Sequence, residues 1–182
     1  MTSYTGSLSP EYALLGLLER QPAHGYELHQ RLANNLGQIW HISQSQTYNI
    51  LNRLEDQGFI AGAMQAQEKL PARRQFHLTE QGRQRFEDWL GATSSCSVRA
   101  IRVEFITRLY FAQERNPQLA RELITAQTAD IQAGLARLKI QLNDLPIDQV
   151  FNRLGLELRI RQLSSIIDWL EDCRAAIQIR PK

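Results

Sequence analysis

A run of polar side chains between Ser43 and Arg53 has the chemistry needed to recognise the edges of nucleic acid bases. Glutamine and asparagine amides can form paired hydrogen bonds with adenine, and arginine can do so with guanine. No Asp or Glu occurs from Leu28 to Leu54, so no carboxylate on this stretch would repel phosphates. The residues that we expect to contact DNA here are Ser43, Gln44, Ser45, Gln46, Tyr48, Asn49 and Arg53.

These side chains also have alternative roles. A polar helix face is often simply solvated. Gln46 follows Ser43 at the spacing of a capping box, so it has the alternative of capping its own helix. Tyr48 recurs with Leu51 and Leu54, a spacing that predicts the buried side of the helix, so packing or lining of a groove competes with base contact.

A second group of basic residues follows in the polar segment 65–74. Lys69, Arg73 and Arg74 have the charge for contacts with phosphate, which position a protein on DNA without specifying the sequence. The alternative is a solvated basic loop.

The three tryptophans, Trp40, Trp89 and Trp169, are expected either to pack in the core or to line a ligand cleft that stacks a flat aromatic effector. The histidines lack carboxylate or thiol partners at ligand spacing, so we expect no metal site. No nucleophile motif or glycine-rich phosphate loop is present. We therefore predict no catalytic residues, no cofactor and no enzyme activity.

The elements that would position these residues follow the outline of a winged helix. Capping and apolar periodicity predict a helix from Ser9, a second over about 24–36, a third over about 43–57 and a fourth from Thr79 to Leu90. Two short strands, 59–64 and 75–78, would flank the basic loop and form a two-stranded wing.

The second half of the chain is predicted to be entirely helical. Asn116-Pro117 favours the start of a long helix that ends near Asn143, and a last helix follows Pro146. About three amphipathic helices lack the bulk for a self-contained core, so a homodimer is expected. The predicted fold is mainly α, with a winged helix-turn-helix domain at 8–91 and an all-α dimerisation domain at 92–182.

Bulk composition is typical of a soluble globular protein. Apolar residues make up 43% and charged residues 22% of the 182 residues. The chain shows no membrane span and no secretory signal, and its two cysteines form no motif, so we expect a cytoplasmic location. The N-terminal half is close to neutral in charge, which favours an alternative function: a winged-helix protein-interaction or ligand-sensing module without sequence-specific DNA binding.

Several sequence blocks occur in the order seen in a known family. The chain closely resembles the PadR family of bacterial transcriptional regulators over about residues 8–90. The matching blocks are Leu14-Leu15-Gly16-Leu17-Leu18, His24-Gly25-Tyr26-Glu27-Leu28, a stretch from Ser43 to Ile60, and Arg73-Arg74-Gln75-Phe76-His77-Leu78-Thr79. The segment from Val103 to Phe111 is similar to the helical C-terminal domain of longer members.

The resemblance implies a homodimeric DNA-binding transcriptional regulator, with repression expected here. It implies a pseudo-palindromic operator in double-stranded DNA, with the third helix in the major groove and the wing on the flanking backbone. Some members sense a small aromatic effector. The wing segment 68–72 and the turn Ser43-Gln44-Ser45-Gln46 depart from the usual pattern, so the operator cannot be transferred from relatives.

Overall fold

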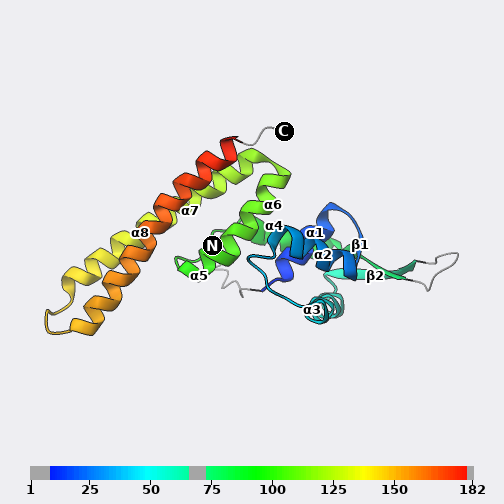
Figure 1. Ribbon diagram of the computed structural model, residues 1–182, viewed down its shortest axis with the longest axis horizontal. Helices are drawn as coiled ribbons and strands as arrows, with labels where there is room; N and C mark the ends of the chain where they lie inside the picture. The colour runs from blue at the N-terminus through cyan, green and yellow to red at the C-terminus, as the bar shows by residue number, and fades with distance from the viewer. Residues whose placement is uncertain (1–8, 66–72, 180–182) are drawn as a thin grey trace. The chain divides into compact units, whose positions relative to one another are not determined.

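The computed structural model describes residues 9–65 and 73–179, which divide into two compact units between Ala92 and Thr93 (Figure 1). The N-terminal unit is a winged helix, so the predicted mainly α fold is confirmed. Its elements are, in chain order, α1 (Glu11–Arg20), β1 (Ala23–His24), α2 (Gly25–Leu36), α3 (Gln44–Asp56), β2 (Ile60–Gln65), β3 (Arg73–Leu78) and α4 (Glu80–Leu90).

The core of this unit is centred on α1, which is buried from Glu11 to Leu18. A helix that is apolar on nearly all sides must be covered on all sides, and α2, α3 and α4 each turn an apolar face toward the core. Full burial of a large apolar side chain stabilises a fold by about 1.5–3 kcal/mol. The largest buried apolar side chains are Trp89, Phe86, Leu14, Leu15, Leu28, Leu32, Leu51 and Leu54.

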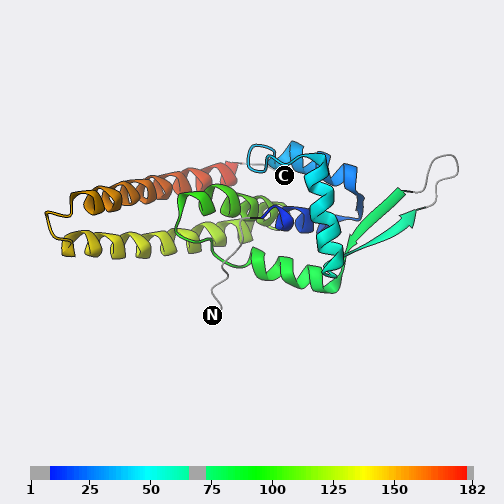
Figure 2. The same ribbon diagram turned by 90° about the horizontal axis from the view of Figure 1, so that it is seen from below.

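The wing belongs to a three-stranded antiparallel sheet with the order β1-β3-β2, and Figure 2 shows the two long strands of its hairpin. The hairpin pairs Ile60 with Leu78 and Gln65 with Arg73, and the short β1 pairs Ala23 with Phe76. The sequence predicted only the two hairpin strands. The third strand is two residues long, too short to show a period of its own, and it forms because Phe76 and Gln75 lie opposite it.

Two long antiparallel helices, α7 (Pro117–Asp144) and α8 (Val150–Ile179), dominate the C-terminal unit (Figure 1). The predicted start of α7 is observed, because the Asn116 side chain accepts a hydrogen bond from the Gln118 amide at 2.9 Å. The other elements are α5 (Val98–Ala100), a π-helical turn η1 (Ile101–Phe105) and α6 (Ile106–Arg115). In the described ranges, no helix combines the length and apolarity that crossing a bilayer requires.

The start of the C-terminal unit is anchored through Ser94. Its amide donates to Gln127 Oε1 at 2.8 Å, and its carbonyl accepts from Gln127 Nε2 at 3.0 Å. Arg108 donates to the Ser94 hydroxyl at 2.6 Å and to Glu104 at 2.8 Å. Ser94 and Gln127 are 33 positions apart, so local composition does not indicate these bonds.

Candidate nucleic-acid interface

Helix α3 is fixed at its first turn by bonds to its own cap and to α2. The Gln46 amide donates to Ser43 Oγ at 3.2 Å, and the Ser43 amide donates to Gln46 Oε1 at 2.8 Å. The Thr47 hydroxyl donates to the Ser43 carbonyl and accepts from His29 Nδ1, at 3.1 and 3.0 Å. Thr47, Ile50, Leu51 and Leu54 form the buried side, so the opposite side faces outward.

We name five of the exposed residues of α3 its outer face: Gln44, Ser45, Tyr48, Asn49 and Asn52. The side chains of Gln44, Ser45, Asn49 and Asn52 make no hydrogen bond to any described part of the chain, so their amides and hydroxyl can bind a partner. Asn52 was not among the expected DNA contacts. Its position one turn beyond Tyr48 and Asn49 is the signal that places it on this face.

The prediction that Tyr48 lies on the buried side of α3 is wrong. Its side chain is exposed at 38%, because Thr47 and Ile50 occupy the buried positions instead. The Tyr48 ring lies against the backbone of Gly25, so close that a Cβ at Gly25 would come within 2.5 Å of Cε1. Gly25 is thus the residue type that lets the ring rest on α2.

Two residues expected to contact DNA are engaged within the protein. Gln46 uses its carboxamide oxygen to cap α3, the alternative that its spacing indicated. Arg53 forms an ion pair with Glu11, whose carboxylate also accepts from Arg85 at 3.1 Å. Glu11 is nearly buried, so losing either arginine would leave a poorly solvated charge. This geometry favours a scaffold role for Arg53 over base contact.

The wing arginine that the structure describes in full is also paired. Arg74 donates to Glu55 Oε1 at 2.7 Å, and the Gly62 amide donates to the same oxygen at 2.9 Å. Its guanidinium lies 5.5 Å from the centre of the Phe76 ring. Contact with phosphate would therefore require Arg74 to leave Glu55. Lys69 lies outside the described residues, as does the side chain of Arg73, so both contacts remain predictions.

Trp40 and Trp89 belong to the N-terminal unit, and Trp169 belongs to the C-terminal unit. Trp89 is exposed at only 1%, stacks on Tyr12 with ring centres 4.7 Å apart and lies 5.8 Å from Phe86. Trp40 lies in the turn before α3, and Trp169 lies in α8 with its ring edge-on to Phe105. For Trp89 the structure favours the packing role.

The described residues include two cysteines, and both thiols have raised pKa values. Burial raises the pKa of the Cys173 thiol to about 11, and the neighbouring Asp172 adds to the shift. Burial and Asp130 raise the pKa of Cys96 as well. Both thiols are therefore protonated at neutral pH and poor nucleophiles. No three His, Cys, Asp or Glu side chains gather into a metal-binding group in the described ranges.

Comparison with known proteins assigns both halves of the chain to described families. Residues 14–88 match the transcriptional regulator PadR-like family, and residues 101–178 match the family described as virulence activator alpha C-term. The first match contains α2, α3, the wing and almost all of α4, so it includes the outer face of α3.

Full-length relatives also match. The negative transcriptional regulator PadR of Bacillus subtilis (strain 168) is 28% identical over 176 residues, which are 92% of this chain and 96% of that protein. A crystal structure of Bacillus subtilis PadR in complex with operator DNA gives a TM-score of 0.46 at 28% identity, over 92% of this chain and 98% of that one. Another, in complex with p-coumaric acid, gives 0.42 at 27% identity, over 93% and 98%. Residues 14–88 of this chain are thus similar to the transcriptional regulator PadR-like family, and the chain as a whole is similar to the Bacillus subtilis regulator.

Proposed function

We propose that this protein is a DNA-binding transcriptional repressor that binds a pseudo-palindromic operator as a homodimer. Helix α3 enters the major groove, and the wing follows the flanking backbone. The observation that carries the proposal is the outer face of α3, which presents unpaired amides and a hydroxyl on a capped and anchored helix. The Bacillus subtilis relative, a negative transcriptional regulator, supports repression.

Asn49→Ala is the sharpest test of the outer face. Asn49 is exposed and makes no described hydrogen bond, so its loss should leave the fold intact. If it reads adenine, the variant should bind the operator roughly ten- to hundredfold more weakly, as expected for a lost two-pronged base contact. Operator fragments are first selected from the DNA upstream of the protein's own gene and then titrated by fluorescence anisotropy.

The matched control is Asn34→Ala, which makes the same chemical change at an exposed position of α2 away from the outer face of α3. It should bind the operator like the unaltered protein. Binding should also weaken steeply with added salt, because phosphate contacts release counterions. If no fragment shows salt-sensitive binding, the interaction or ligand-sensing module becomes the better description of this winged helix.

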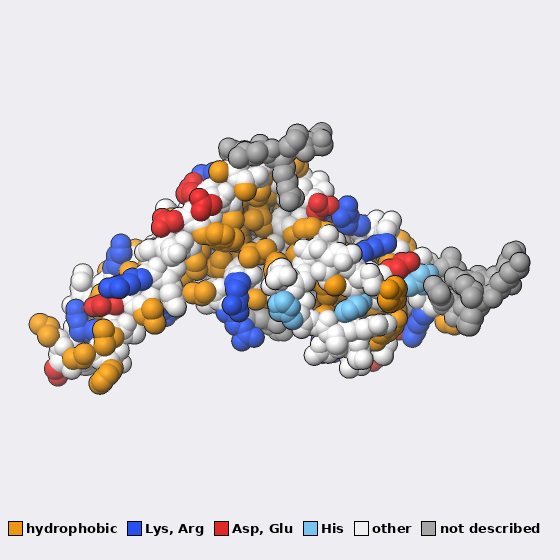
Figure 3. All heavy atoms as spheres, viewed as in Figure 1, with side chains coloured by type: hydrophobic (Ala, Val, Ile, Leu, Met, Phe, Trp, Pro, Cys, Tyr) orange, Lys and Arg blue, Asp and Glu red, His pale blue; other side chains and the backbone are white. Residues whose placement is uncertain are grey.

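The homodimer is supported by an apolar surface at the turn between α7 and α8. Five large apolar side chains are exposed there, and Figure 3 shows apolar side chains gathered at that end of the hairpin. Soluble proteins seldom leave such a cluster uncovered, and a second copy of the chain is the simplest cover. The residues are Ile147, Val150, Phe151, Leu154 and Leu158.

Phe151→Glu should convert the dimer into a monomer. Phe151 is exposed at 89% in the single chain, so the substitution removes little intramolecular packing but places a charge in the subunit contact. Sedimentation equilibrium should then give the mass of one chain. Gln162→Glu adds the same charge elsewhere on α8 and should stay dimeric. If the Phe151→Glu variant is also a dimer, the subunits contact each other through another surface.

A further inference from the structure

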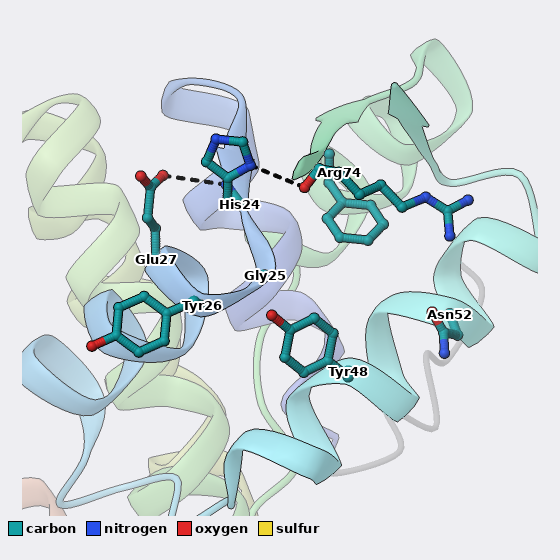
Figure 4. Close-up of a pocket in the computed structure, with 8 residues that line it drawn as sticks. His24, Gly25, Tyr26, Glu27, Tyr48, Asn52 and Arg74 are labelled. Atoms are coloured by element: carbon teal, nitrogen blue, oxygen red, sulfur yellow. Dashed lines mark hydrogen bonds between the residues drawn. The ribbon is translucent and has the colours of Figure 1, made fainter. Parts of the chain in front are cut away.

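The C-terminal unit contains a small hollow with two arginines in its wall. It has a volume of ≈ 170 Å³ and is lined by α7, by α8 and by the segment that precedes α5. The hollow in Figure 4 is a different one, because it shares Tyr48 and Asn52 with the outer face of α3 and so belongs to the candidate DNA interface. We name the first of these the arginine hollow, and its polar side chains are Cys96, Arg137, Gln141 and Arg159.

Helix spacing brings these groups together. On α7, Gly134, Arg137 and Gln141 are three and four positions apart, so they lie on one face of the helix. On α8, Arg159 lies one turn before Leu163, whose buried side chain also lines the hollow. Because α7 and α8 pack against each other, each helix contributes one guanidinium group to the same small space.

The Cys96 side chain packs against α7 at Gly134. A Cβ at Gly134 would lie 3.2 Å from the Cys96 sulfur and 3.9 Å from Arg137 Nη2, so the glycine leaves room for both groups. The thiol donates to the Asp130 carbonyl at 3.3 Å. Burial and the Asp130 carboxylate raise the pKa of Cys96, and Arg137 and Arg159 each oppose that shift. Both guanidinium groups therefore act on a charge placed beside Cys96.

The charge of the two arginines has no local counterpart. Within the ranges 9–65 and 73–179, neither Arg137 nor Arg159 forms a hydrogen bond or an ion pair, and the following residues 180–182 include no Asp or Glu. Two like charges on one small hollow repel each other, and an anion between them replaces repulsion by attraction. Leu138 and Leu163 supply a buried apolar wall, which strengthens that attraction by excluding water from one side.

We propose that the arginine hollow binds a tetrahedral oxyanion, either free phosphate or the phosphate group of a small phosphomonoester. Each guanidinium presents a planar fork of N–H donors that matches one edge of an oxyanion. A carboxylate has a single such edge, whereas a tetrahedral ion has one for each of the two forks. The Gln141 amide adds a neutral donor. The volume lies below the about 300–1,000 Å³ of pockets for drug-sized molecules, so the hollow suits an ion or a short ester.

The first test titrates inorganic phosphate with the full-length protein at constant ionic strength and follows binding by phosphorus NMR. Arg137→Gln and Arg159→Gln should each weaken binding roughly two- to fivefold, the usual value of an exposed ion pair, and the double variant should weaken it further. Arg161→Gln is the matched control, because it makes the same change at an exposed position of α8 outside the hollow. Asp130→Asn should strengthen binding, because it removes a carboxylate close to Cys96.

The second test uses the Cys96 thiol to report on occupancy of the hollow. A phosphate beside the sulfur disfavours the thiolate, so alkylation by the neutral reagent iodoacetamide at mildly alkaline pH should be slower in phosphate than in chloride at equal ionic strength. Cys173 does not line the hollow and should react at the same rate in both salts. In the Arg137→Gln/Arg159→Gln variant the difference at Cys96 should disappear. Peptide mass spectrometry measures both rates.

Glycerol 3-phosphate and acetate distinguish the sources of the anion. Tighter binding of glycerol 3-phosphate than of inorganic phosphate assigns the hollow to phosphomonoesters, and the reverse order assigns it to the free ion. The inference is overturned if phosphate does not bind, if acetate binds as tightly as phosphate, or if Arg161→Gln weakens binding as much as Arg137→Gln does. These experiments contain no DNA, so neither result decides the proposed function.

Discussion

Arg108→Ala is expected to destabilise the C-terminal unit by about 3–5 kcal/mol, because it breaks a buried ion pair by removing one of its two members. Arg108 is exposed at only 1%, and it donates to Glu104 and to Ser94. The variant would remove the ion pair with Glu104 and the hydrogen bond that Arg108 donates to the Ser94 hydroxyl. Urea unfolding followed by circular dichroism should show a lower midpoint for this unit.

The control for Arg108→Ala is the double variant Glu104→Leu/Arg108→Met, which replaces the pair with apolar groups of similar volume. Apolar replacement of a buried ion pair is often neutral or stabilising, so the double variant should unfold near the unaltered protein. If it is as unstable as the single variant, the cost lies in the lost bond to Ser94 and in packing around η1, rather than in the broken ion pair.

Trp89→Ala is expected to cost the N-terminal unit about 3–5 kcal/mol, the usual loss for removing a fully buried large aromatic side chain. The indole stacks on Tyr12 and packs near Phe86, so its removal leaves a cavity between α1 and α4. The unfolding midpoint in urea measures the loss, with Trp40→Ala as the matched substitution at a less buried tryptophan.

The same variant distinguishes packing from ligand binding at Trp89. If the role is packing, operator affinity measured at low temperature, where the protein remains folded, should match that of the unaltered protein. An unchanged unfolding midpoint, combined with a lost response to aromatic compounds, would instead assign Trp89 to an effector site.

Features encoded by neighbouring residues were predictable from the sequence. The capping box at Ser43 and Gln46, and the start of α7 at Asn116, depend on residues two or three positions apart. A bond of that kind acts within one turn, so the local sequence is enough to specify it. For the same reason the positions of α2, α3 and the hairpin strands followed from periodicity.

Features that depend on distant residues were not predictable. Glu11 and Arg53 are 42 positions apart, and Arg85 is 74 positions from Glu11. Nothing in the sequence around Arg53 indicates that its charge is matched by the first helix. Tyr48 was misplaced because spacing alone did not distinguish it from Ile50, whereas contact of Thr47 with His29 fixes the rotation of α3. The rotation of a helix about its own axis is set by its contacts with neighbouring elements, which local sequence does not specify.

The bridge from Glu11 to both Arg53 and Arg85 has a bearing on how this protein can evolve. The bridge attaches α3 to α1 and α4. The amides and the hydroxyl that would contact DNA lie on the outer face of α3 and take no part in the bridge. Exchanging exposed residues such as Gln44 or Asn49 should shift folding stability by no more than about 0.5 kcal/mol. Gene duplicates could therefore acquire new targets through a few neutral steps, with Glu11 and its arginines retained throughout.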